Sequence, residues 1–513
     1  MAKTEQSGGK TLANGRKKFY VTTPIYYVND KPHIGHAYTS TATDVLARWH
    51  RLLGDDTFLL TGTDENTLKL VEKAKKEGVE PREIADRYAE RFEASAKVME
   101  ISYDRFIRTT DEAKHHPGAQ EIWKRIESAG HIYKGTYEGL YCVDCEAYYT
   151  EKDLTDGKCP IHSTPPQKLK EENYFFKLSA FGDQVKEAID SGKYEVVPET
   201  RRNEILSVIA GGLKDVSCSR PADKLTMGVP VPGDDTQRMY VWFEALTNYL
   251  NGIGFGWDEK RFARYWPADI HVIGKEISRF HAAIWPAMLL AAELPLPKKL
   301  YVHGFFTMEG EKMSKSKGNV VDPFELVEKH GVDPVRYYLL RALPYAEDGD
   351  FSERRFKEMY DSELANDLGN LASRVLTLVE KKCDGKVPEG KADPKLKEHV
   401  AQTHHELANL LDAPKFAEAL ERLNGLVSLA NRFIEENKVY QQEGDDLNGS
   451  LYTLAQTLGH LALLYQPFIP GKAGELQQRL GLKPDGWDAD SLLEWEKVPA
   501  GTKVAKGEPL FPK

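Results

Sequence analysis

The sequence contains few cysteines and no long apolar segment. Five cysteines in 513 residues are too few for a framework of disulfide bonds. The best apolar candidate, residues 284–292, is followed by Glu293 and two prolines, so no segment is expected to cross a bilayer. Residues 1–18 are polar and lack the apolar stretch of a signal peptide. We therefore expect a soluble, cytoplasmic protein with a disordered N-terminal arm.

An excess of basic charge is also missing. The formal net charge is −10, which argues against a protein coated by nucleic acid. A large enzyme can still confine basic residues to one groove and bind RNA there. Apolar residues make up 41% of the chain and charged residues 29%, which is typical of a globular protein with several domains.

The first part of the chain alternates between strand and helix patterns. Residues 19–23 (FYVTT) and 57–61 (TFLLT) are short apolar, β-branched runs typical of buried strands. A helix is expected from Gly35 to Leu53, and another over residues 67–76. This order predicts a doubly wound parallel sheet of the Rossmann type.

The pattern is interrupted and then resumes. From His131 onward the chain has short aromatic segments, clustered cysteines and frequent glycine and proline, which suggests a small irregular insertion. Strand and helix character returns at residues 239–249, and residues 270–273 and 300–306 are predicted strands. One sheet domain split by an insertion is therefore expected.

The last part of the chain is predicted to be an all-α bundle. Beyond Asp361, apolar residues recur at steps of three and four, which gives each helix one apolar stripe. The three stripes consist of Leu364, Leu368, Leu371, Val375 and Leu378, then Phe416, Leu420, Leu423, Val427, Ala430 and Ile434, then Leu451, Leu454, Leu458, Leu461 and Tyr465.

Two histidines stand at the start of the first predicted helix. His33 and His36 flank Ile34 and Gly35, and positions three apart share a helical face. Both imidazoles and the free N–H groups of the helix start can therefore point at one anion. Donors fixed around an α-phosphate would stabilise the charge that develops during nucleophilic attack. An isolated pair of this kind is more often two surface histidines or half of a metal site.

A lysine- and serine-rich run lies much further along the chain. Lys312, Met313, Ser314, Lys315 and Ser316 precede a glycine and can form a mobile cationic clamp for a polyphosphate. Taken alone, the run is more often a solvated basic loop.

Together and in this order, the two motifs resemble the HIGH and KMSKS signatures of the class I aminoacyl-tRNA synthetases. The resemblance implies that both bind ATP and stabilise the transition state of adenylate formation. The catalytic residues expected from it are His33, His36, Lys312 and Lys315. The expected ATP-binding residues are His33, Gly35, His36, Gly274, Glu276, Lys312, Met313, Ser314, Lys315 and Ser316. ATP would arrive with Mg²⁺, for which the sequence has no dedicated cage.

Three of the cysteines are clustered with a histidine. The pairs Cys142–Cys145 and Cys159–His162 have the spacing of a tetrahedral zinc site with three thiolates and one imidazole. Four protein ligands leave no open position, so one structural Zn²⁺ is expected rather than a catalytic one. A set of reduced core thiols is the alternative.

Within the class, nearly the whole chain from Phe19 resembles the methionyl-tRNA synthetases. The resemblance rests on residues 22–29 (TTPIYYVN), 61–65 (TGTDE), 240–246 (YVWFEAL) and 274–281 (GKEISRFH). It implies that Asp64 pairs with the substrate ammonium. The methionine pocket implied by it is formed by Ile25, Tyr27, Trp242, Tyr249, Ile277 and His281.

The choice of methionine has physical support. A polarisable, unbranched thioether is best held by aromatic and apolar groups. Enzymes for leucine, isoleucine and valine need a large editing domain, and the insertion of about a hundred residues is too short for one. The remaining alternatives are a class I synthetase for another amino acid, a catalytically dead zinc-containing tRNA-binding protein, and a nucleotidyltransferase acting on a small molecule.

The chain departs from the family pattern at several positions. Asn66 and Thr67 stand where the family usually has His-Gly, and Glu244 and Glu276 each replace an aspartate. One extra methylene moves a carboxylate by about 1.5 Å. Pro-Trp is the usual pair at the positions of Val439 and Tyr440.

The first bundle helix carries a predicted RNA contact. Asn370 and Arg374 are four residues apart and share a polar flank suited to unstacked bases. The resemblance implies that these two residues and Tyr440 bind the anticodon of tRNA(Met). A solvated polar face is the alternative. No oligonucleotide-binding appendage follows the bundle, so a monomer is expected.

The predicted domain order has six parts. They are a disordered arm at 1–18, the first half of the catalytic domain at 19–130, the connective insertion with the zinc knuckle at 131–230, the second half of the catalytic domain at 231–300, a stem-contact region with the lysine–serine loop at 301–360, and a helical anticodon-binding domain at 361–513.

Overall fold

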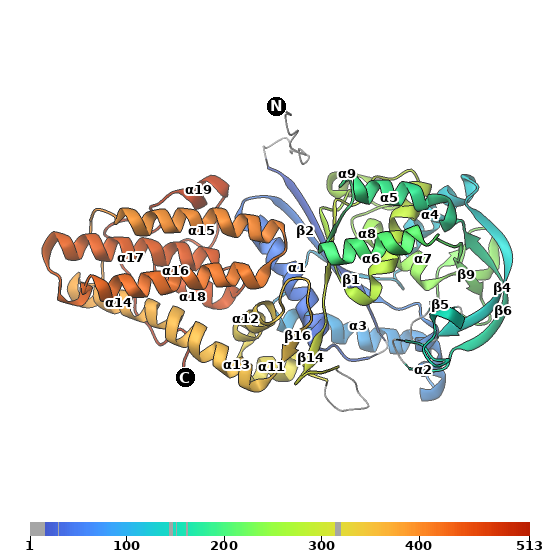
Figure 1. Cartoon of the computed structure of the whole chain (residues 1–513), viewed down its shortest axis with the longest axis horizontal. Coiled ribbons are helices and arrows are strands. Elements are labelled where there is room, and N and C mark those ends of the chain that lie inside the picture. Colours follow the sequence, from blue (N-terminus) through green and yellow to red (C-terminus); the bar gives the residue numbers. More distant parts are fainter. Residues whose placement is uncertain (1–15, 29, 143–146, 150, 161–162, 313–319) are drawn as a thin grey trace.

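The computed structural model describes residues 16–28, 30–142, 147–149, 151–160, 163–312 and 320–513. The molecule is elongated, with the strands and their covering helices at one end and a helical region at the other (Figure 1). The predicted arm lies outside the described residues apart from 16–18, and Lys18 already begins the first strand.

A parallel sheet of six strands forms the centre of the N-terminal region. Its order is β3-β2-β1-β12-β13-β7, and every neighbouring pair is parallel. β7 comes from the range predicted as the insertion and lies at the edge of the sheet. The strands are β1 (Lys18–Tyr27), β2 (Asp56–Asp64), β3 (Arg105–Arg108), β7 (Glu195–Val197), β12 (Ile270–Gly274) and β13 (Lys299–His303).

Both faces of this sheet are buried. Phe19 and Val21 of β1 belong to the core on one face, whereas Tyr20 between them belongs to the core on the other face. Alternate side chains of a strand point to opposite faces, so a strand covered on both sides reads as a continuous apolar run. This is why the FYVTT pattern predicted a buried strand correctly.

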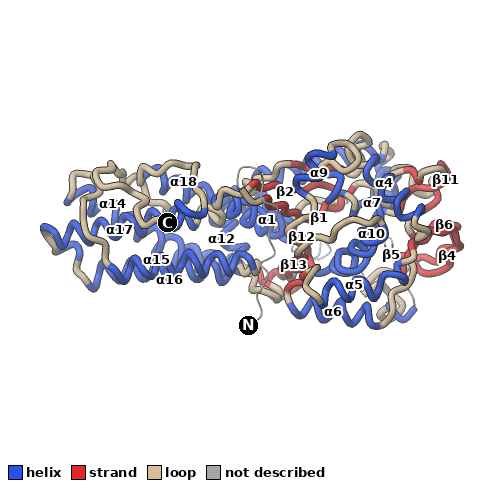
Figure 2. Tube along the Cα trace, turned by 90° about the horizontal axis from the view of Figure 1, so that it is seen from above, coloured by secondary structure: helices blue, strands red, loops and turns tan. Residues whose placement is uncertain are grey.

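Helices cover the two faces of the sheet (Figures 1 and 2). On the first face lie α1 (Ile34–Leu52), α2 (Leu68–Glu77) and α3 (Pro81–Val98). On the second face lie α4 (His116–Ser128), α5 (Gly182–Asp190), α6 (Glu199–Ala210), α7 (Val241–Leu246), α8 (Asn248–Asn251), α9 (Glu259–Tyr265) and α10 (Trp285–Ala291).

The insertion between β3 and β12 carries antiparallel strands of its own. One sheet has the order β5-β4-β6-β8 and the other β10-β11-β9. The strands are β4 (Ile132–Cys142), β5 (Ala147–Tyr149), β6 (Gln167–Phe176), β8 (Val216–Ser217), β9 (Ser219–Pro221), β10 (Pro230–Val231) and β11 (Asp234–Met239).

A third small sheet follows β13 and leads towards the helical region. It has the order β15-β14-β16. Its strands and the two helices beside it are β14 (Phe306–Met308), β15 (Glu311–Lys312), β16 (Gly349–Phe351), α11 (Pro323–His330) and α12 (Val332–Ala342).

The predicted helical bundle is confirmed. All residues of the three apolar stripes are buried except Leu378 of the first stripe, which is partly buried. The helices are α13 (Glu353–Met359), a π-helical stretch (Tyr360–Gly369), α14 (Asn370–Lys382), α15 (Pro394–Asp412), α16 (Phe416–Glu436), a short 3₁₀ turn (Val439–Gln441), α17 (Gly444–Leu464), α18 (Pro470–Arg479) and α19 (Ala489–Leu493).

A buried arginine joins the bundle to the sheet region. Arg336 of α12 is fully buried, and its Nη2 lies 2.8 Å from Asp44 Oδ2 on α1. Its Nε donates to the carbonyl of Phe468 after α17 at 3.0 Å, and Nη1 donates to that of Met99 after α3 at 2.9 Å. A buried pair of this kind persists only when its remaining hydrogen-bonding groups are satisfied, as they are here. The helix that begins at the two motif histidines is therefore tied directly to the bundle.

Among the described residues, every helix is too short or too polar to cross a membrane.

Candidate active site

Two of the predicted ATP-site segments, at His33 and at Gly274, follow neighbouring strands at the carboxyl edge of the parallel sheet. β1 and β12 are neighbours, but the chain leaves them in opposite directions, since β2 follows on one side and β13 on the other. Ligands of doubly wound sheets bind at this kind of switch point. The chain after β1 leads to His33, and β12 ends at Gly274.

His33 and His36 start α1 and hold each other in place. His33 is the N-cap, and its Nδ1 accepts the N–H of Gly35 at 3.1 Å. The Nδ1 of His36 accepts the N–H of His33 at 3.1 Å, and the two rings are 3.9 Å apart. A Cβ at position 35 would lie 2.9 Å from the His33 ring, which explains the glycine. Because each Nδ1 is an acceptor, the proton of each neutral ring is on Nε2.

Both imidazoles are held in the neutral form. Burial lowers the pKa of His33 to about 4. Burial, together with the charge of His33, lowers the pKa of His36 well below its ordinary value. Near neutral pH both rings are therefore uncharged Nε2–H donors, which suits recognition of a phosphate oxygen.

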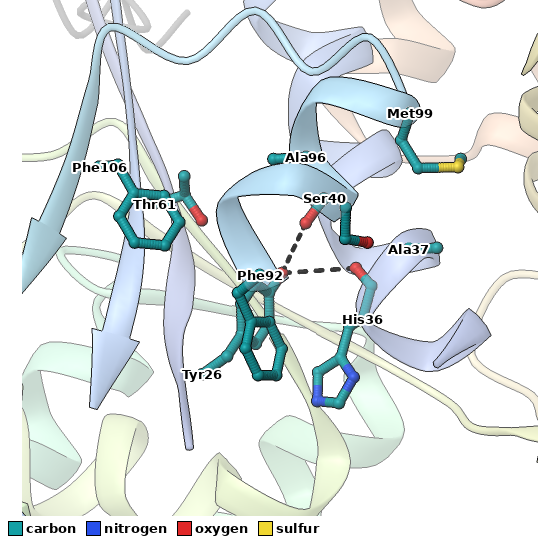
Figure 3. Close-up of a pocket in the computed structure, with 10 residues that line it drawn as sticks. Tyr26, His36, Ala37, Ser40, Thr61, Phe92, Ala96, Met99 and Phe106 are labelled. Carbon is teal, nitrogen blue, oxygen red and sulfur yellow. Dashed lines mark hydrogen bonds between the residues drawn. The ribbon is translucent and has the colours of Figure 1, made fainter. Parts of the chain in front are cut away.

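The rings of Tyr26 and Phe92 pack against the ring of His36 (Figure 3). Its ring lies 5.0 Å from that of Tyr26 and 5.1 Å from that of Phe92, both edge-on. The hydroxyl of Tyr26 lies 2.8 Å from Ser40 Oγ on α1. These contacts fix the direction in which His36 presents its Nε2 edge.

The start of α1 contacts the chain that follows the lysine–serine run. The N–H of Ile34 donates to the carbonyl of Val321, five residues beyond Ser316, at 3.1 Å. Lys312 lies on β15, opposite Thr307 of β14. Met313, Ser314, Lys315 and Ser316 lie outside the described residues.

At the end of β12 the carboxylate of Glu276 lies over Gly274, so a Cβ at position 274 would overlap with it. Glu276 is exposed on the turn that follows β12. Lys275, between them, pairs with Asp348 at 2.7 Å and so anchors the turn to the segment before β16.

The predicted methionine pocket contains a stack of aromatic rings. The ring of Tyr27 lies 5.8 Å from that of Trp242, edge-on. Trp242 is stacked on Phe280 at 3.6 Å. Phe280 is not among the predicted pocket residues, because no feature of the sequence distinguishes a stacking ring from an ordinary core ring.

Two further predicted pocket residues, Tyr249 and His281, contact each other. The Tyr249 hydroxyl is 2.7 Å from His281 Nε2, and His281 Nδ1 lies 3.0 Å from the carbonyl of Ile277. Burial, opposed by that carbonyl, lowers the pKa of His281 to about 4. Neutral His281 therefore donates through Nδ1 to Ile277 and accepts from Tyr249, so three predicted pocket residues are linked.

Asp64 lies at the end of β2 beside these groups. It pairs in register with Tyr27 of β1 and is buried. Burial raises the pKa of Tyr249, and the charge of Asp64 is among the further causes. The predicted ammonium-binding carboxylate is thus close to the predicted pocket. Ile25, also on β1, is partly buried against the same core.

Two departures from the family pattern contact each other. The Nδ2 of Asn66 donates to Glu244 Oε1 at 2.9 Å. The other oxygen of Glu244 lies 2.5 Å from His115 Nε2. All three side chains are buried. His115 has no sequence signal, because the contact joins residues from three separate segments.

Two of the four predicted zinc ligands are described. Cys142 ends β4 and Cys159 lies further along the insertion; both are buried. Thr164 connects them: its Oγ1 lies 3.9 Å from Cys142 Sγ, and its carbonyl accepts the N–H of Cys159 at 2.9 Å. Cys145 and His162 lie outside the described residues, and the described residues alone contain no cluster of three metal-ligating side chains.

The predicted anticodon residues lie near one end of α16. Arg374 of α14 pairs with Glu435 of α16 at 2.5 Å. Tyr440 follows α16 and is 45% exposed, and Asn370 is also exposed. Arg374 and Tyr440 are thus linked through the last turn of α16.

The fold and the site together define a class I aminoacyl-tRNA synthetase. Residues 19–167 and 150–376 match the family described as "tRNA synthetases class I (M)". Residues 385–513 match the "Anticodon binding domain of methionyl tRNA ligase". The chain belongs to the methionyl-tRNA synthetase family.

Individual relatives agree over almost the whole chain. The chain is 44% identical to a methionine–tRNA ligase of Caldanaerobacter subterraneus subsp. tengcongensis, over 97% of this chain and 79% of that protein. It is 42% identical to one of Brucella suis biovar 1, over 97% of this chain and 98% of that protein. The structure of Mycobacterium tuberculosis methionyl-tRNA synthetase in complex with methionyl-adenylate matches with a TM-score of 0.92 and 39% identity, covering 97% of this chain and 100% of that one.

Proposed function

We propose that this chain is a methionine–tRNA ligase that activates methionine with ATP and transfers it to tRNA(Met). The observation that supports the proposal is the hydrogen bond between Ile34 and Val321, because it links the start of α1, where His33 and His36 lie, to the chain that follows the lysine–serine run. The carboxylate of methionine attacks the α-phosphate of ATP, pyrophosphate leaves, and the terminal ribose hydroxyl of the tRNA then attacks the adenylate.

His33 and His36 donate their Nε2–H groups to the phosphate oxygens as charge develops on them. Donors that are already oriented need no rearrangement at the transition state, which is where such groups lower the barrier most. Lys312 and Lys315 stabilise the leaving pyrophosphate, and Mg²⁺ arrives with ATP. The remaining ATP-binding residues of the proposal are Gly35, Gly274, Glu276, Met313, Ser314 and Ser316.

Methionine binds between Asp64 and the aromatic rings. The carboxylate of Asp64 pairs with the ammonium group, and the thioether lies against the ring of Trp242, a favourable contact for a polarisable sulfur atom. The other residues of this pocket are Ile25, Tyr27, Tyr249, Ile277 and His281. The linkage of Tyr249, His281 and Ile277 by hydrogen bonds supports a pocket of fixed shape.

The helical region binds the anticodon of tRNA(Met). Asn370 and Arg374 contact unpaired bases, and Tyr440 offers an exposed ring for stacking. We retain the predicted division into an arm, a split catalytic domain, an insertion, a stem-contact region and an anticodon-binding domain, and a monomer as the working form.

One structural Zn²⁺ is bound in the insertion by Cys142, Cys145, Cys159 and His162. The burial of both described cysteines and their common contact with Thr164 fit such a site. When bound, the metal fixes the fold of a segment that has little apolar core. Metal analysis of the purified protein should give about one zinc per chain. The Cys142→Ser variant should lose zinc and melt at a lower temperature, whereas Cys383→Ser, outside the insertion, should keep it. A metal-free protein with unchanged melting temperature contradicts the zinc site.

Methionine-dependent exchange of radiolabelled pyrophosphate into ATP tests the activity. We expect exchange with methionine, little with leucine, and charging of tRNA(Met). Exchange with leucine but not methionine would assign the chain to another substrate. Exchange without tRNA charging would favour a nucleotidyltransferase, and tRNA binding without exchange a dead binding protein.

A further inference from the structure

A group of buried polar side chains lies behind the proposed methionine pocket. Glu244 of α7 has an accessible fraction of 0%, and its two oxygens bind different partners. Oε1 accepts the Nδ2–H of Asn66 at 2.9 Å, and Oε2 lies 2.5 Å from Nε2 of His115. Asn251 of α8 completes the group, with its Nδ2 3.2 Å from the other ring nitrogen of His115. We call these four residues the Glu244 cluster.

Among the described residues, no lysine or arginine contacts Glu244, so no permanent positive charge balances its carboxylate. Burial raises the pKa of Glu244 well above its ordinary value, and burial lowers the pKa of His115 to about 3. Burial therefore disfavours the charged form of each group, and Oε2 and Nε2 share a hydrogen bond. A buried polar group is tolerated when its hydrogen bonds are made, and it becomes costly when one is removed.

The position of the cluster connects the two sides of the pocket. Asn66 is two residues after Asp64, and Trp242 is two residues before Glu244 on α7. Asn66 is also held through its Nδ2 to the carbonyl of Thr109 at 3.3 Å. The carboxylate of Glu244, on the helix that carries Trp242, therefore contacts the segment that directly follows Asp64.

Glu65, the residue after Asp64, makes a second set of hydrogen bonds that hold this segment. Glu65 is buried and accepts hydrogen bonds from Arg108 Nε at 2.7 Å and Nη2 at 2.9 Å. Its N–H donates to Thr109 Oγ1 at 2.9 Å. Glu65 is thus held at the end of β3, and the hydrogen bond between Asn66 and Glu244 connects the same segment to α7.

We propose that Glu244 is a positioning residue that sets the separation between the Asp64 carboxylate and the Trp242 indole, and so selects amino acids of the length of methionine. This inference rests on the proposed function, because it assigns those two groups to the ends of the bound substrate. Glu244 itself does not touch the substrate. It acts because an ammonium group and a thioether at fixed spacing are recognised only when both sides of the pocket are correctly spaced.

The Glu244→Asp variant tests the spacing. The shorter side chain draws the carboxylate back by about 1.5 Å, so it cannot keep its contacts with both Asn66 and His115. We expect the KM for methionine in pyrophosphate exchange to rise about 10-fold, the effect of one lost hydrogen bond, with kcat and the KM for ATP changed less than about 2-fold. The preference for methionine over ethionine should fall, because the pocket is no longer held at one length. Glu187→Asp, the same change on the exposed surface of α5, should alter none of these values.

A second substitution in the same contact distinguishes positioning from general damage. In the Glu244→Asp background, Asn66→Gln returns the missing methylene from the opposite side and should bring the KM for methionine back to within about 3-fold of the original value. Asn66→Gln alone should raise the KM, so the two changes should be strongly non-additive. If Glu244→Asp fails to fold, Asn66→Ala is used, with the same expected rise in the KM for methionine.

Each result decides the inference. A rise in the KM for methionine with rescue in the double variant supports it. An unchanged KM in either single variant overturns it, as does an equal loss in kcat and in both KM values with a lowered melting temperature, which indicates a merely structural role. Absence of methionine-dependent exchange in the unsubstituted enzyme overturns the proposed function as well, whereas normal exchange there with unaffected variants overturns this inference alone.

Discussion

The sheet region and the helical bundle each contain a pair of histidines in contact, and the two pairs are used differently. His33 and His36 are half-buried, and each Nδ1 accepts a backbone N–H at the start of α1. His404 and His460 are buried between α15 and α17, where His404 Nε2 lies 2.8 Å from His460 Nδ1. His460 Nε2 lies 3.0 Å from the carbonyl of Trp495.

The difference between the pairs lies in their remaining hydrogen-bonding groups. At the site, backbone groups bind Nδ1, and among the described residues no hydrogen bond is made by either Nε2–H group, so both can bind a ligand. In the bundle, the hydrogen-bond chain from His404 through His460 ends on the backbone at Trp495 and so holds the C-terminal segment against α17. The same residue type therefore serves recognition in one region and packing in the other. Buried polar groups that satisfy each other stabilise the fold, whereas oriented groups left available can bind.

The largest expected effect comes from the site pair. Asn in place of His33 can still accept the N–H of Gly35, since asparagine is a good N-cap, but it has no Nε2–H. We expect kcat for pyrophosphate exchange to fall about 10²- to 10³-fold, as for loss of one transition-state donor, with little change in melting temperature. His399→Asn, an exposed substitution on α15, should leave both unchanged. Retained activity in His33→Asn would remove His33 from the mechanism.

In the bundle pair the expected effect is on stability instead. His460→Leu leaves the carbonyl of Trp495 and the ring nitrogen of His404 buried without their partner. We expect the free energy of unfolding to fall by about 1–3 kcal/mol in urea titrations, with kcat for exchange per folded molecule unchanged. His405→Ala, one residue away from the pair and exposed, should cost less than about 0.5 kcal/mol. A loss of exchange in His460→Leu would contradict the division of roles.

A third substitution, in the bundle, should affect the binding of tRNA but not the activation of methionine in the sheet region. Tyr440→Ala removes an exposed ring from the bundle and should weaken tRNA(Met) binding by about 1–3 kcal/mol, the usual value of one base stacked on an aromatic ring. Aminoacylation should then show a raised KM for tRNA, while methionine-dependent exchange, which needs no tRNA, stays the same. Tyr452→Ala, elsewhere on the bundle, is the matched control for loss of a tyrosine. An unchanged KM for tRNA would exclude Tyr440 from anticodon binding.

The smallest effect, measured over a single pH unit, is the pH dependence of stability. Burial, with the nearby charge of Lys497, lowers the pKa of His404 to about 4. Between its ordinary pKa of 6.5 and this value the unfolded chain binds a proton that the folded chain does not, so stability is present above pH 6.5 and falls as the pH decreases. One such histidine contributes at most about 1.4 kcal/mol per pH unit. Urea midpoints at several pH values should show a shallower decline for His404→Gln than for the unsubstituted protein, and an equal decline would contradict the shifted pKa.

The sequence predicted the bundle and the main strands correctly for the same reason. Residues 416–434 were assigned to one helix from their apolar spacing alone, and α16 spans Phe416–Glu436. Residues 57–61 were assigned to a strand, and β2 spans Asp56–Asp64. Burial of one helical stripe or of a whole strand requires an apolar pattern that is visible along the chain.

The candidate site was predicted only in part. His33 and His36 could be selected because they are three positions apart at the start of one helix. Phe280 and His115 could not, because their contacts with Trp242 and Glu244 join segments that are distant in sequence. In the sequence, Asn66 and Glu244 are two separate departures from the family pattern, and only the structure shows that they contact each other.

The sequence by itself determined the order of the elements, the two signature motifs and the helical stripes, since these depend on residues within a few positions of one another. The tertiary structure alone decided that Val321 meets the start of α1, that one glutamate links both sides of the pocket, and that one histidine pair remains available while the other is buried. The physical reason is that hydrogen bonds between distant segments depend on distance and direction in the folded chain, which no local pattern encodes.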